Sequence, residues 1–303
     1  MSANWSNAAG RLAAATVLSS NLTRTEKLYA SCFGYEAVDR GEISGNLAGS
    51  WATPGMKNCN YVLMTPRPND TYALRIVEAE PAGAFAPLTT YGWGALELAV
   101  KDVVAVHETV REHPEFTVIG PPRDITFGAP VRPMQCVGPS REVFFLTEVL
   151  EETSADSPER ASTPVDQLFI AILAAPDRDR AVRHYVDRID LEAGQTFDME
   201  YRTLNAAFGL PQGTHQSFTM VNSAAGPILQ IDQYPANASK RPVRPGMLPP
   251  GIGMISLIVP NLDDVSAEFL APPRALREAP YDGRRTATTI GSAGEYIELI
   301  EQS

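Results

Sequence analysis

Residues 47–64 (LAGSWATPGMKNCNYVLM) and residues 204–221 (LNAAFGLPQGTHQSFTMV) align without a gap, and the second copy follows the first by 157 residues. Both copies begin with Leu, carry a large aromatic residue four positions later (Trp51 and Phe208) and a proline three positions after that, and end in an apolar run. A chain that repeats itself over such a distance is built from related structural units. The repeat therefore predicts two similar halves.

Two shorter matches extend the repeat. Residues 72–77 (YALRIV) correspond to residues 227–232 (PILQID), and residues 92–102 (GWGALELAVKD) correspond to residues 251–261 (GIGMISLIVPN). In each half we recognise two segments in which a strand is followed by a helix and then by further strands. These four segments begin near Arg11, Gly92, Val165 and Gly251.

The length and the composition indicate how the halves are joined. A chain of 303 residues can form two domains of about 150 residues, each with its own core. Residues 151–164 (EETSADSPERASTP) are acidic, rich in Ser, Thr and Pro, and without apolar periodicity, which is typical of an exposed linker. We therefore expect an N-terminal module of residues 1–150, a linker of residues 151–164 and a C-terminal module of residues 165–303.

The charge and the cysteines exclude several classes of protein. With 36 acidic and 25 basic residues the net charge is −11, which disfavours nucleic acid or an anionic membrane as a partner. The first ten residues lack a signal-peptide pattern and no apolar run is long enough to span a bilayer, so we expect a cytoplasmic protein. Cys32, Cys59 and Cys136 lie far apart and favour neither a disulfide framework nor a zinc site.

Three segments resemble the vicinal oxygen chelate superfamily, which includes glyoxalases, bleomycin-resistance proteins and extradiol dioxygenases. Residues 25–36 (TEKLYASCFGYE) are similar to its first helix, residues 92–102 to its fifth strand, and residues 294–301 (GEYIELIE) to its last strand. The resemblance implies an α+β fold of four tandem βαβββ repeats, which form two glyoxalase-like modules with curved mixed sheets.

In that superfamily a metal is held by side chains from the first, fourth, fifth and eighth strands of a module, commonly His or Gln, Glu, His and Glu. By the resemblance, these positions fall at Ala14, Arg75, Ala95 and Phe145 in the first half and at Gln167, Gln230, Met254 and Glu298 in the second. The first set contains no ligand for a divalent cation, and the second combines one carboxylate with two amides and a thioether. We therefore expect no metal and no cofactor, and metal-dependent extradiol dioxygenase chemistry is the least favoured function.

The concave face of the second module still carries polar residues. A carboxylic acid among apolar walls has a raised pKa, so Glu298 is a candidate general acid or base, with His215 as its partner. The candidate substrate-binding residues are Gln167, Gln230, Tyr201, Arg202, Met254, Phe208 and Arg75. Asp232 shares a strand face with Gln230 because residues two apart on a strand point the same way.

Structural roles compete with these functional ones. His215 is equally explained as a surface residue, Glu298 as a remnant of a lost metal site, and Tyr201 and Arg202 as a solvated loop. For Arg75 the alternative to anion binding is an internal ion pair with Glu97 that fills a vacated metal site.

Two functions of different classes follow. The first is a metal-independent lyase, isomerase or hydrolase that acts by acid-base catalysis on a small organic molecule, aromatic-derived compounds included, in the C-terminal module. The alternative is a non-catalytic protein that binds and sequesters a small molecule, as bleomycin-resistance proteins do. In both cases we expect a homodimer, because half-open sheets leave strand edges that must be covered.

Overall fold

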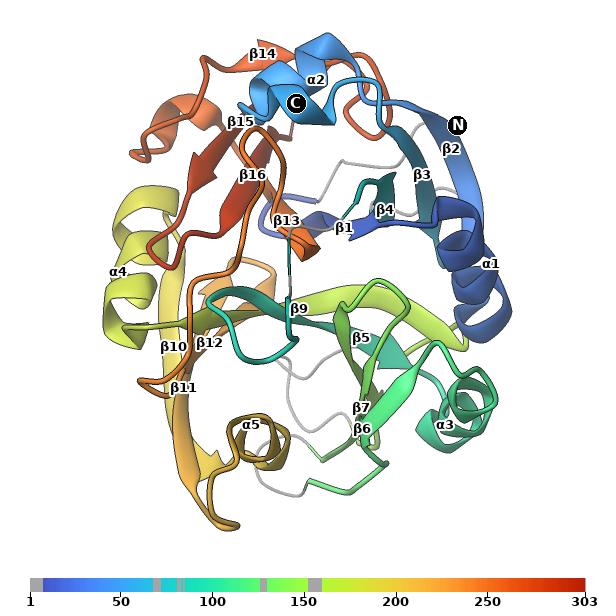
Figure 1. The fold of residues 1–303 in the computed structure, drawn as a ribbon. Helices are drawn as coiled ribbons and strands as arrows, with labels where there is room; N and C mark the ends of the chain where they lie inside the picture. Colours follow the sequence, from blue (N-terminus) through green and yellow to red (C-terminus); the bar gives the residue numbers. More distant parts are fainter. Residues whose placement is uncertain are drawn as a thin grey trace.

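The computed structural model describes residues 8–67, 72–80, 83, 85–125, 130–151 and 160–302. These residues form two eight-stranded mixed sheets, one above the other in Figure 1. In spatial order the first sheet consists of β14 (Arg274–Ala275), β15 (Arg285–Ile290), β16 (Tyr296–Glu301), β13 (Gly251–Val259), β1 (Leu12–Ser19), β4 (Ala73–Glu78), β3 (Asn60–Thr65) and β2 (Glu36–Glu42). The second sheet consists of β10 (Glu192–Glu200), β11 (His215–Ser223), β12 (Gly226–Gln233), β9 (Val165–Ala175), β5 (Gly92–Val100), β8 (Val143–Val149), β7 (Val131–Val137) and β6 (Thr117–Gly120).

Short helices connect the strands. They are α1 (Leu22–Phe33), α2 (Gly45–Ser50), α3 (Val103–Arg111), α4 (Arg178–Ile189) and α5 (Arg202–Phe208), with 3₁₀ turns η1 (Pro54–Met56) and η2 (Leu262–Asp264). Polar side chains cap two of these helices: the side chain of Asn21 accepts from the N–H of Arg24 at the start of α1, and Asp177 accepts from the N–H of Arg180 in α4. α1 and α4 therefore begin at polar capping residues, whereas α5 has no side-chain capping bond.

The predicted fold class is confirmed. In chain order the described elements form four units of one strand, a helical segment and three strands, beginning with β1, β5, β9 and β13. The first unit also contains α2 and η1 between its strands, and the third contains α5. The fourth unit departs from the expected order of strand, helix and strands, because only the 3₁₀ turn η2 forms after β13. After it, the N–H of Ser266 bonds to the carbonyl of Arg188, which draws the chain toward α4.

The units combine differently from the expectation. β1 pairs antiparallel with β13, and β5 pairs antiparallel with β9, so each sheet takes four strands from each half of the chain. The expectation that residues 1–150 and residues 165–303 each build their own sheet is therefore wrong; of the predicted linker, residues 152–159 lie outside the described part. The physical reason is that all four units begin with a similar apolar strand, so the hydrophobic pattern alone does not distinguish between the possible partners.

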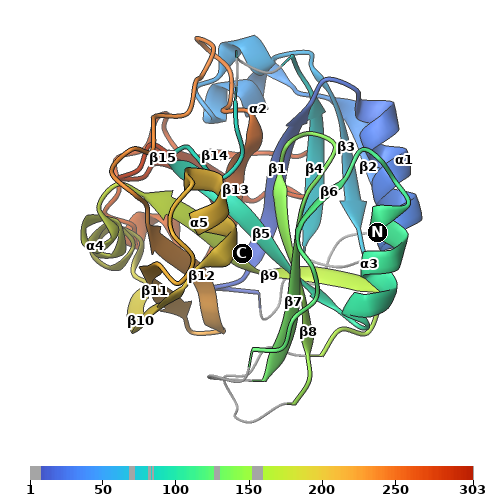
Figure 2. The same cartoon turned by 60° about the horizontal axis from the view of Figure 1, so that its bottom comes forward.

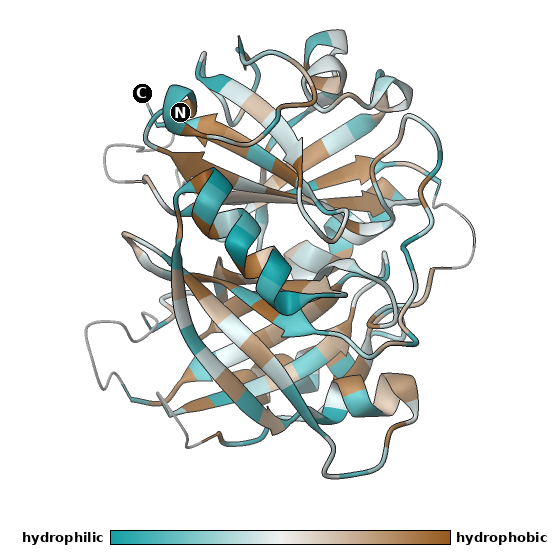
Figure 3. Ribbon diagram, turned by 90° about the vertical axis from the view of Figure 1, so that its left-hand side faces the viewer, coloured by the Kyte–Doolittle hydropathy of each residue, from teal (hydrophilic) through white to brown (hydrophobic). Residues whose placement is uncertain are grey.

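Each sheet has two differently buried faces. One face packs, together with α1, α3 and α4, into a continuous apolar core that includes Phe33, Leu96, Phe144 and Leu257. Figure 3 shows α4 with its hydrophilic side outward, and its Tyr185 belongs to this core. The opposite face of each sheet is concave and has its own apolar cluster. We call these concave faces the first cup and the second cup, after their sheets.

The two copies of the longest sequence repeat lie against the two cups. Residues 47–64 contain the end of α2, η1 and most of β3, and residues 204–221 contain most of α5 and of β11. Figures 1 and 2 show α2 within the curve of the first sheet and α5 within the curve of the second. The two halves thus place equivalent short helices against the two cups.

Candidate functional site

The first cup contains a buried ion pair at the positions where the superfamily binds metal. Arg75 lies beside Thr16 across the β1 and β4 ladder, and Ser256 lies beside Glu298 across the β13 and β16 ladder. An Nη1 atom of Arg75 lies 3.8 Å from Oε2 of Glu298. The expected ion pair exists, but the partner of Arg75 is Glu298 and not Glu97, which lies in the other sheet.

Glu298 is fully engaged by its neighbours. Its Oε1 atom accepts hydrogen bonds from Nε1 of Trp51 and from the hydroxyl of Tyr281, both at 2.7 Å. Its Oε2 atom accepts from the hydroxyl of Ser256 at 2.5 Å. The guanidinium of Arg75 lies 5.1 Å from the ring centroid of Trp51 and donates to the Tyr281 hydroxyl at 2.7 Å. Both charges are therefore held in place by hydrogen bonds and by aromatic faces.

This cluster is sealed from solvent. Arg75 is 1% exposed and Glu298 is 0% exposed, and Trp51, Met254 and Tyr281 are equally buried around them. Arginine cannot ligate a cation, and both oxygens of Glu298 are occupied, so these residues do not fit the superfamily's metal. Glu298 and Met254 thus belong to a closed structural cluster and have no access to a substrate.

The second cup has different residues at the equivalent positions. Gln230 lies beside Ile172 across the β12 and β9 ladder, and Glu97 lies beside Phe145 across the β5 and β8 ladder. One carboxylate and one amide beside two apolar residues do not fit the superfamily's metal either. Among the described residues, no group of three or more His, Cys, Asp or Glu side chains could hold a metal ion.

Glu97 is a partly accessible carboxyl group in this cup. Its Oε1 atom accepts from the hydroxyl of Thr147 at 2.7 Å, and within the described part of the chain no group donates to its Oε2 atom. The side chain is half-buried. Burial raises its pKa to about 7, against a lowering by the Thr147 hydrogen bond. The group can therefore both accept and release a proton near neutral pH.

Asp232 is a second carboxyl group with a raised pKa in the same cup. It is 2% exposed and accepts from Nε2 of Gln230 at 2.7 Å and from the hydroxyl of Tyr201. Burial raises its pKa to about 7; the two hydrogen bonds lower it, and the charge of Glu97 raises it further. Tyr201 is half-buried, with its ring 6.4 Å from that of Phe145. Tyr201, Gln230 and Asp232 thus form one hydrogen-bonded group, as the strand pattern predicted for Gln230 and Asp232.

A pocket of about 700 Å³ opens at the mouth of the second cup. Its apolar wall includes Leu88, Ile119 and Val137, which belong to the same cluster as Phe145 and Tyr201. On the other side α5 contributes Thr203, Ala206 and Ala207; Figure 2 shows this helix over the sheet. The small side chains of α5 leave the mouth open.

The two cups differ because their equivalent aromatic residues point differently. Trp51 follows α2, enters the first cup and reaches Glu298. Phe208, at the end of α5, is half-buried and packs edge-on against Tyr234, with 5.8 Å between the ring centroids. The side chain that closes the first cup therefore has no counterpart deep in the second.

The predicted catalytic pair is not brought together. His215 is the first residue of β11 in the second sheet, whereas Glu298 lies on β16 in the first. The side chain of His215 is 57% exposed, and its Nδ1 atom lies 2.7 Å from Oδ1 of Asp198. His215 therefore lies on the surface, as its alternative role predicted. Arg202 is also exposed and pairs with Glu200, but it begins α5 instead of lying in a loop.

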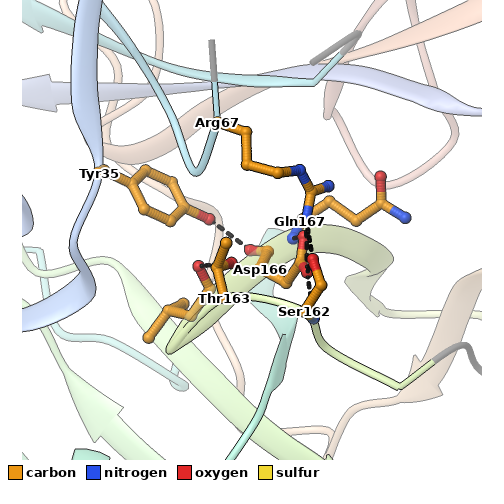
Figure 4. Close-up of polar contacts among 7 residues, drawn as sticks. Tyr35, Arg67, Ser162, Thr163, Asp166 and Gln167 are labelled. Atoms are coloured by element: carbon orange, nitrogen blue, oxygen red, sulfur yellow. Dashed lines mark hydrogen bonds and ion pairs between the residues drawn. The ribbon is translucent and has the colours of Figure 1, made fainter. Parts of the chain in front are cut away.

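Gln167 lies near the start of β9, where the third unit contacts the first, and is therefore not beside Glu298. Figure 4 shows it beside Asp166, at the start of β9. The Asp166 carboxylate accepts from Nη1 of Arg67 at 2.8 Å and from the N–H of Ser162 at 2.7 Å, and the hydroxyl of Tyr35 donates to the Asp166 carbonyl at 2.6 Å. Gln167 contributes its N–H to this network. The network fixes the start of β9 against the unit that begins with β1.

Comparison with known proteins agrees with this fold. No protein-family model and no curated protein sequence matches the chain. Glyoxalase I from Zea mays is similar in structure, with a TM-score of 0.60 and 15% sequence identity, over 96% of this chain and 92% of that one. A candidate dioxygenase from Bacillus subtilis is similar with a TM-score of 0.63 and 13% identity, over 97% of this chain and 86% of that one. The chain therefore has the vicinal oxygen chelate fold, and at these identities the likeness extends to the fold alone.

Proposed function

We propose that the chain is a metal-independent enzyme that moves a proton on a small organic molecule bound in the second cup. The observation that carries this proposal is Glu97, a carboxyl group with a pKa of about 7 whose Oε2 atom has no donor within the described part of the chain. A general base or acid works best when its pKa lies near the working pH. Glu97 meets that condition without a metal ion.

Tyr201 and Asp232 together could supply the hydrogen-bond donor that proton removal by Glu97 requires. With Asp232 ionised, the Tyr201 hydroxyl donates to it. When Asp232 is protonated it can donate to the Tyr201 oxygen, and the Tyr201 hydrogen is then free to bond an oxygen of the substrate. Such a donor stabilises the negative charge that develops when Glu97 removes a proton from a carbon beside a carbonyl group. Return of that proton at another position gives an isomerisation, and loss of a neighbouring group gives an elimination.

The shape of the cup favours a small and largely apolar substrate. Leu88, Ile119 and Val137 form an apolar wall of the pocket. Tyr201 packs against the apolar cluster of this wall, and Glu97 and Gln230 lie on β5 and β12 of the same sheet. A pocket with apolar walls and a few convergent polar groups is typical of small-molecule sites. The class we propose is an enolisable carbonyl compound or a related acid, with lyase or isomerase chemistry ahead of hydrolysis.

A binding protein without turnover is the second candidate. The apolar wall and the open mouth suit sequestration as well as catalysis, and binding does not require a carboxyl group with a pKa near 7. The two candidates therefore differ in whether protons exchange.

Solvent exchange distinguishes them. A panel of enolisable ketones and hydroxy acids is incubated with the protein in D₂O, and loss of the carbon-bound proton signal is followed by NMR. We expect exchange of at least one compound, with Glu97→Gln slowing it by about two to four powers of ten. Glu192→Gln, an exposed Glu on β10, is the matched control and should leave the rate unchanged. Ligand binding without exchange would favour sequestration, and equal loss in both variants would remove Glu97 from the chemistry.

A further inference from the structure

A second pocket lies outside both cups, where β5 and β13 begin. Its volume is about 500 Å³, and its walls include Trp93 from β5, Ile252 from β13, and the turn of residues 291–295 between β15 and β16. Lys240 and Arg241 complete it from the connection between β12 and β13, coloured orange in Figure 1. The pocket therefore takes residues from both sheets.

Arg241 is fixed in this pocket by main-chain and hydroxyl acceptors. Its Nη2 atom donates to the carbonyl of Trp93 at 2.8 Å, its Nη1 atom to the carbonyl of Ile252 at 3.1 Å, and its Nε atom to the hydroxyl of Thr90 at 3.1 Å. The ring of Phe85 lies 4.8 Å from the guanidinium carbon. A guanidinium has five N–H groups, so these three bonds hold its plane and leave two donors.

The positive charge of Arg241 has no protein counter-charge in the described residues. Arg241 is half-buried and the neighbouring Lys240 is exposed, and neither forms an ion pair with a carboxylate there, although the chain as a whole carries a net charge of −11. Half-buried charges are usually paired, and burial lowers the pKa of Arg241 to about 10. An anion bound in the pocket would supply the missing charge.

One carboxyl group does line the pocket, but it is bonded elsewhere. The Oε1 atom of Glu295 accepts from the hydroxyl of Tyr185 at 2.9 Å, and its Oε2 atom accepts from the N–H of Ala293 at 2.8 Å. Burial raises the pKa of Glu295 to about 7, which weakens its negative charge at neutral pH. Glu295 therefore does not neutralise Arg241.

We propose that this pocket binds a small organic oxyanion, a carboxylate or a phosphate monoester, with its charged oxygens on Arg241 and Lys240. Its apolar body would lie against Trp93 and Ile252, which are both in the pocket wall. The proposal rests on a different set of residues from the second cup and does not depend on acid-base catalysis there.

Isothermal titration calorimetry with phenyl phosphate, benzoate and inorganic phosphate tests the proposal. We expect one saturable site per chain, with phenyl phosphate or benzoate binding more tightly than inorganic phosphate because the apolar body adds contact. Lys240→Gln should weaken binding about tenfold, the effect of one charge-assisted hydrogen bond. Arg244→Gln removes the same charge from the same connection at a residue outside the pocket wall, and should change affinity by less than about twofold.

Two further variants keep the test decisive. Arg241→Lys retains the charge, loses the planar fork and should weaken binding more than Lys240→Gln does. Glu97→Gln in the second cup should leave the affinity unchanged. Absence of saturable binding for all three probes, or equal weakening by Lys240→Gln and Arg244→Gln, would overturn the proposal. If inorganic phosphate binds as tightly as phenyl phosphate, the proposed contact between an apolar ligand body and the pocket wall would be refuted.

Discussion

Glu298→Gln is the substitution that most directly probes the sealed first cup. A glutamine can keep the hydrogen bonds, because its carbonyl can accept from Trp51 and Tyr281 while its amide donates to the Ser256 hydroxyl. The change therefore removes the negative charge and little else. Arg75 would then remain as a buried cation without a counter-charge.

The distance between the charges gives the size of the effect. For two unit charges 3.8 Å apart, an effective dielectric constant of about 20 gives an attraction of about 4 kcal/mol. Removing one partner of a buried pair typically destabilises a protein by about 3 to 5 kcal/mol. We therefore expect Glu298→Gln to lower the free energy of unfolding by about 4 kcal/mol.

A double-mutant cycle measured by urea unfolding checks this value. Arg75→Met alone should also destabilise the fold, and Arg75→Met combined with Glu298→Gln should be more stable than the sum of the single effects predicts, by about 3 kcal/mol. Coincident transitions by tryptophan fluorescence and circular dichroism would justify a two-state analysis. A loss below about 1 kcal/mol for Glu298→Gln, or strictly additive effects, would refute the ion pair as a structural element.

Three further predictions concern pH, metal content and assembly. Glu142 and Glu295 are buried carboxyl groups that accept from Tyr29 and Tyr185, and burial raises the pKa of each to about 7. Since the folded-state pKa exceeds the unfolded one, the free energy of unfolding measured with urea should fall by about 3 kcal/mol per group as pH rises from about 4.5 to about 7. Glu142→Gln should flatten this pH dependence, whereas an unchanged slope would contradict it. Elemental mass spectrometry should find far less than one Fe, Mn, Ni or Zn per chain, and EDTA should leave the Tm unchanged, because Arg75 and Phe145 stand where the superfamily has ligands; a stoichiometric metal whose removal lowers the Tm would be the opposite result. Light scattering should give about twice the 32.8 kDa chain mass, as expected for a homodimer, and a species at the chain mass would rule that assembly out.

The fold could be predicted because it depends on short-range patterns that the repeat presents twice. The apolar runs indicated the strands, and the repeat together with the alternation of side chains indicated the concave positions of Arg75, Gln230 and Asp232. The pairing of units could not be predicted in this way. β1, β5, β9 and β13 are all apolar edge strands of their units, and their choice of partner is a property of the folded chain.

The observed pairing of the units also changes which candidate residues share a cup. With each half as its own module, Arg75 and Glu97 would share a cup, and Glu298 would share one with His215. In the observed pairing Arg75 meets Glu298 in a sealed cup, and Glu97 meets Gln230 and Asp232 in an open one. The signal available in the sequence was a carboxyl group on each of two largely apolar strands, Glu97 on β5 and Asp232 beside Gln230 on β12, but it did not show that these strands lie in one sheet.

Acid-base catalysis without a metal depends on Glu97 being partly accessible in the second cup while Glu298 is sealed in the first. One measurement compares these two carboxyl groups directly. Folded Glu97→Gln and folded Glu298→Gln proteins are assayed side by side for proton exchange in D₂O on the same compound. The account predicts that Glu97→Gln loses about two to four powers of ten in rate, while Glu298→Gln keeps the rate of the unmodified protein despite its lower stability. Loss of exchange in Glu298→Gln with full activity in Glu97→Gln would place the chemistry in the first cup and contradict the account.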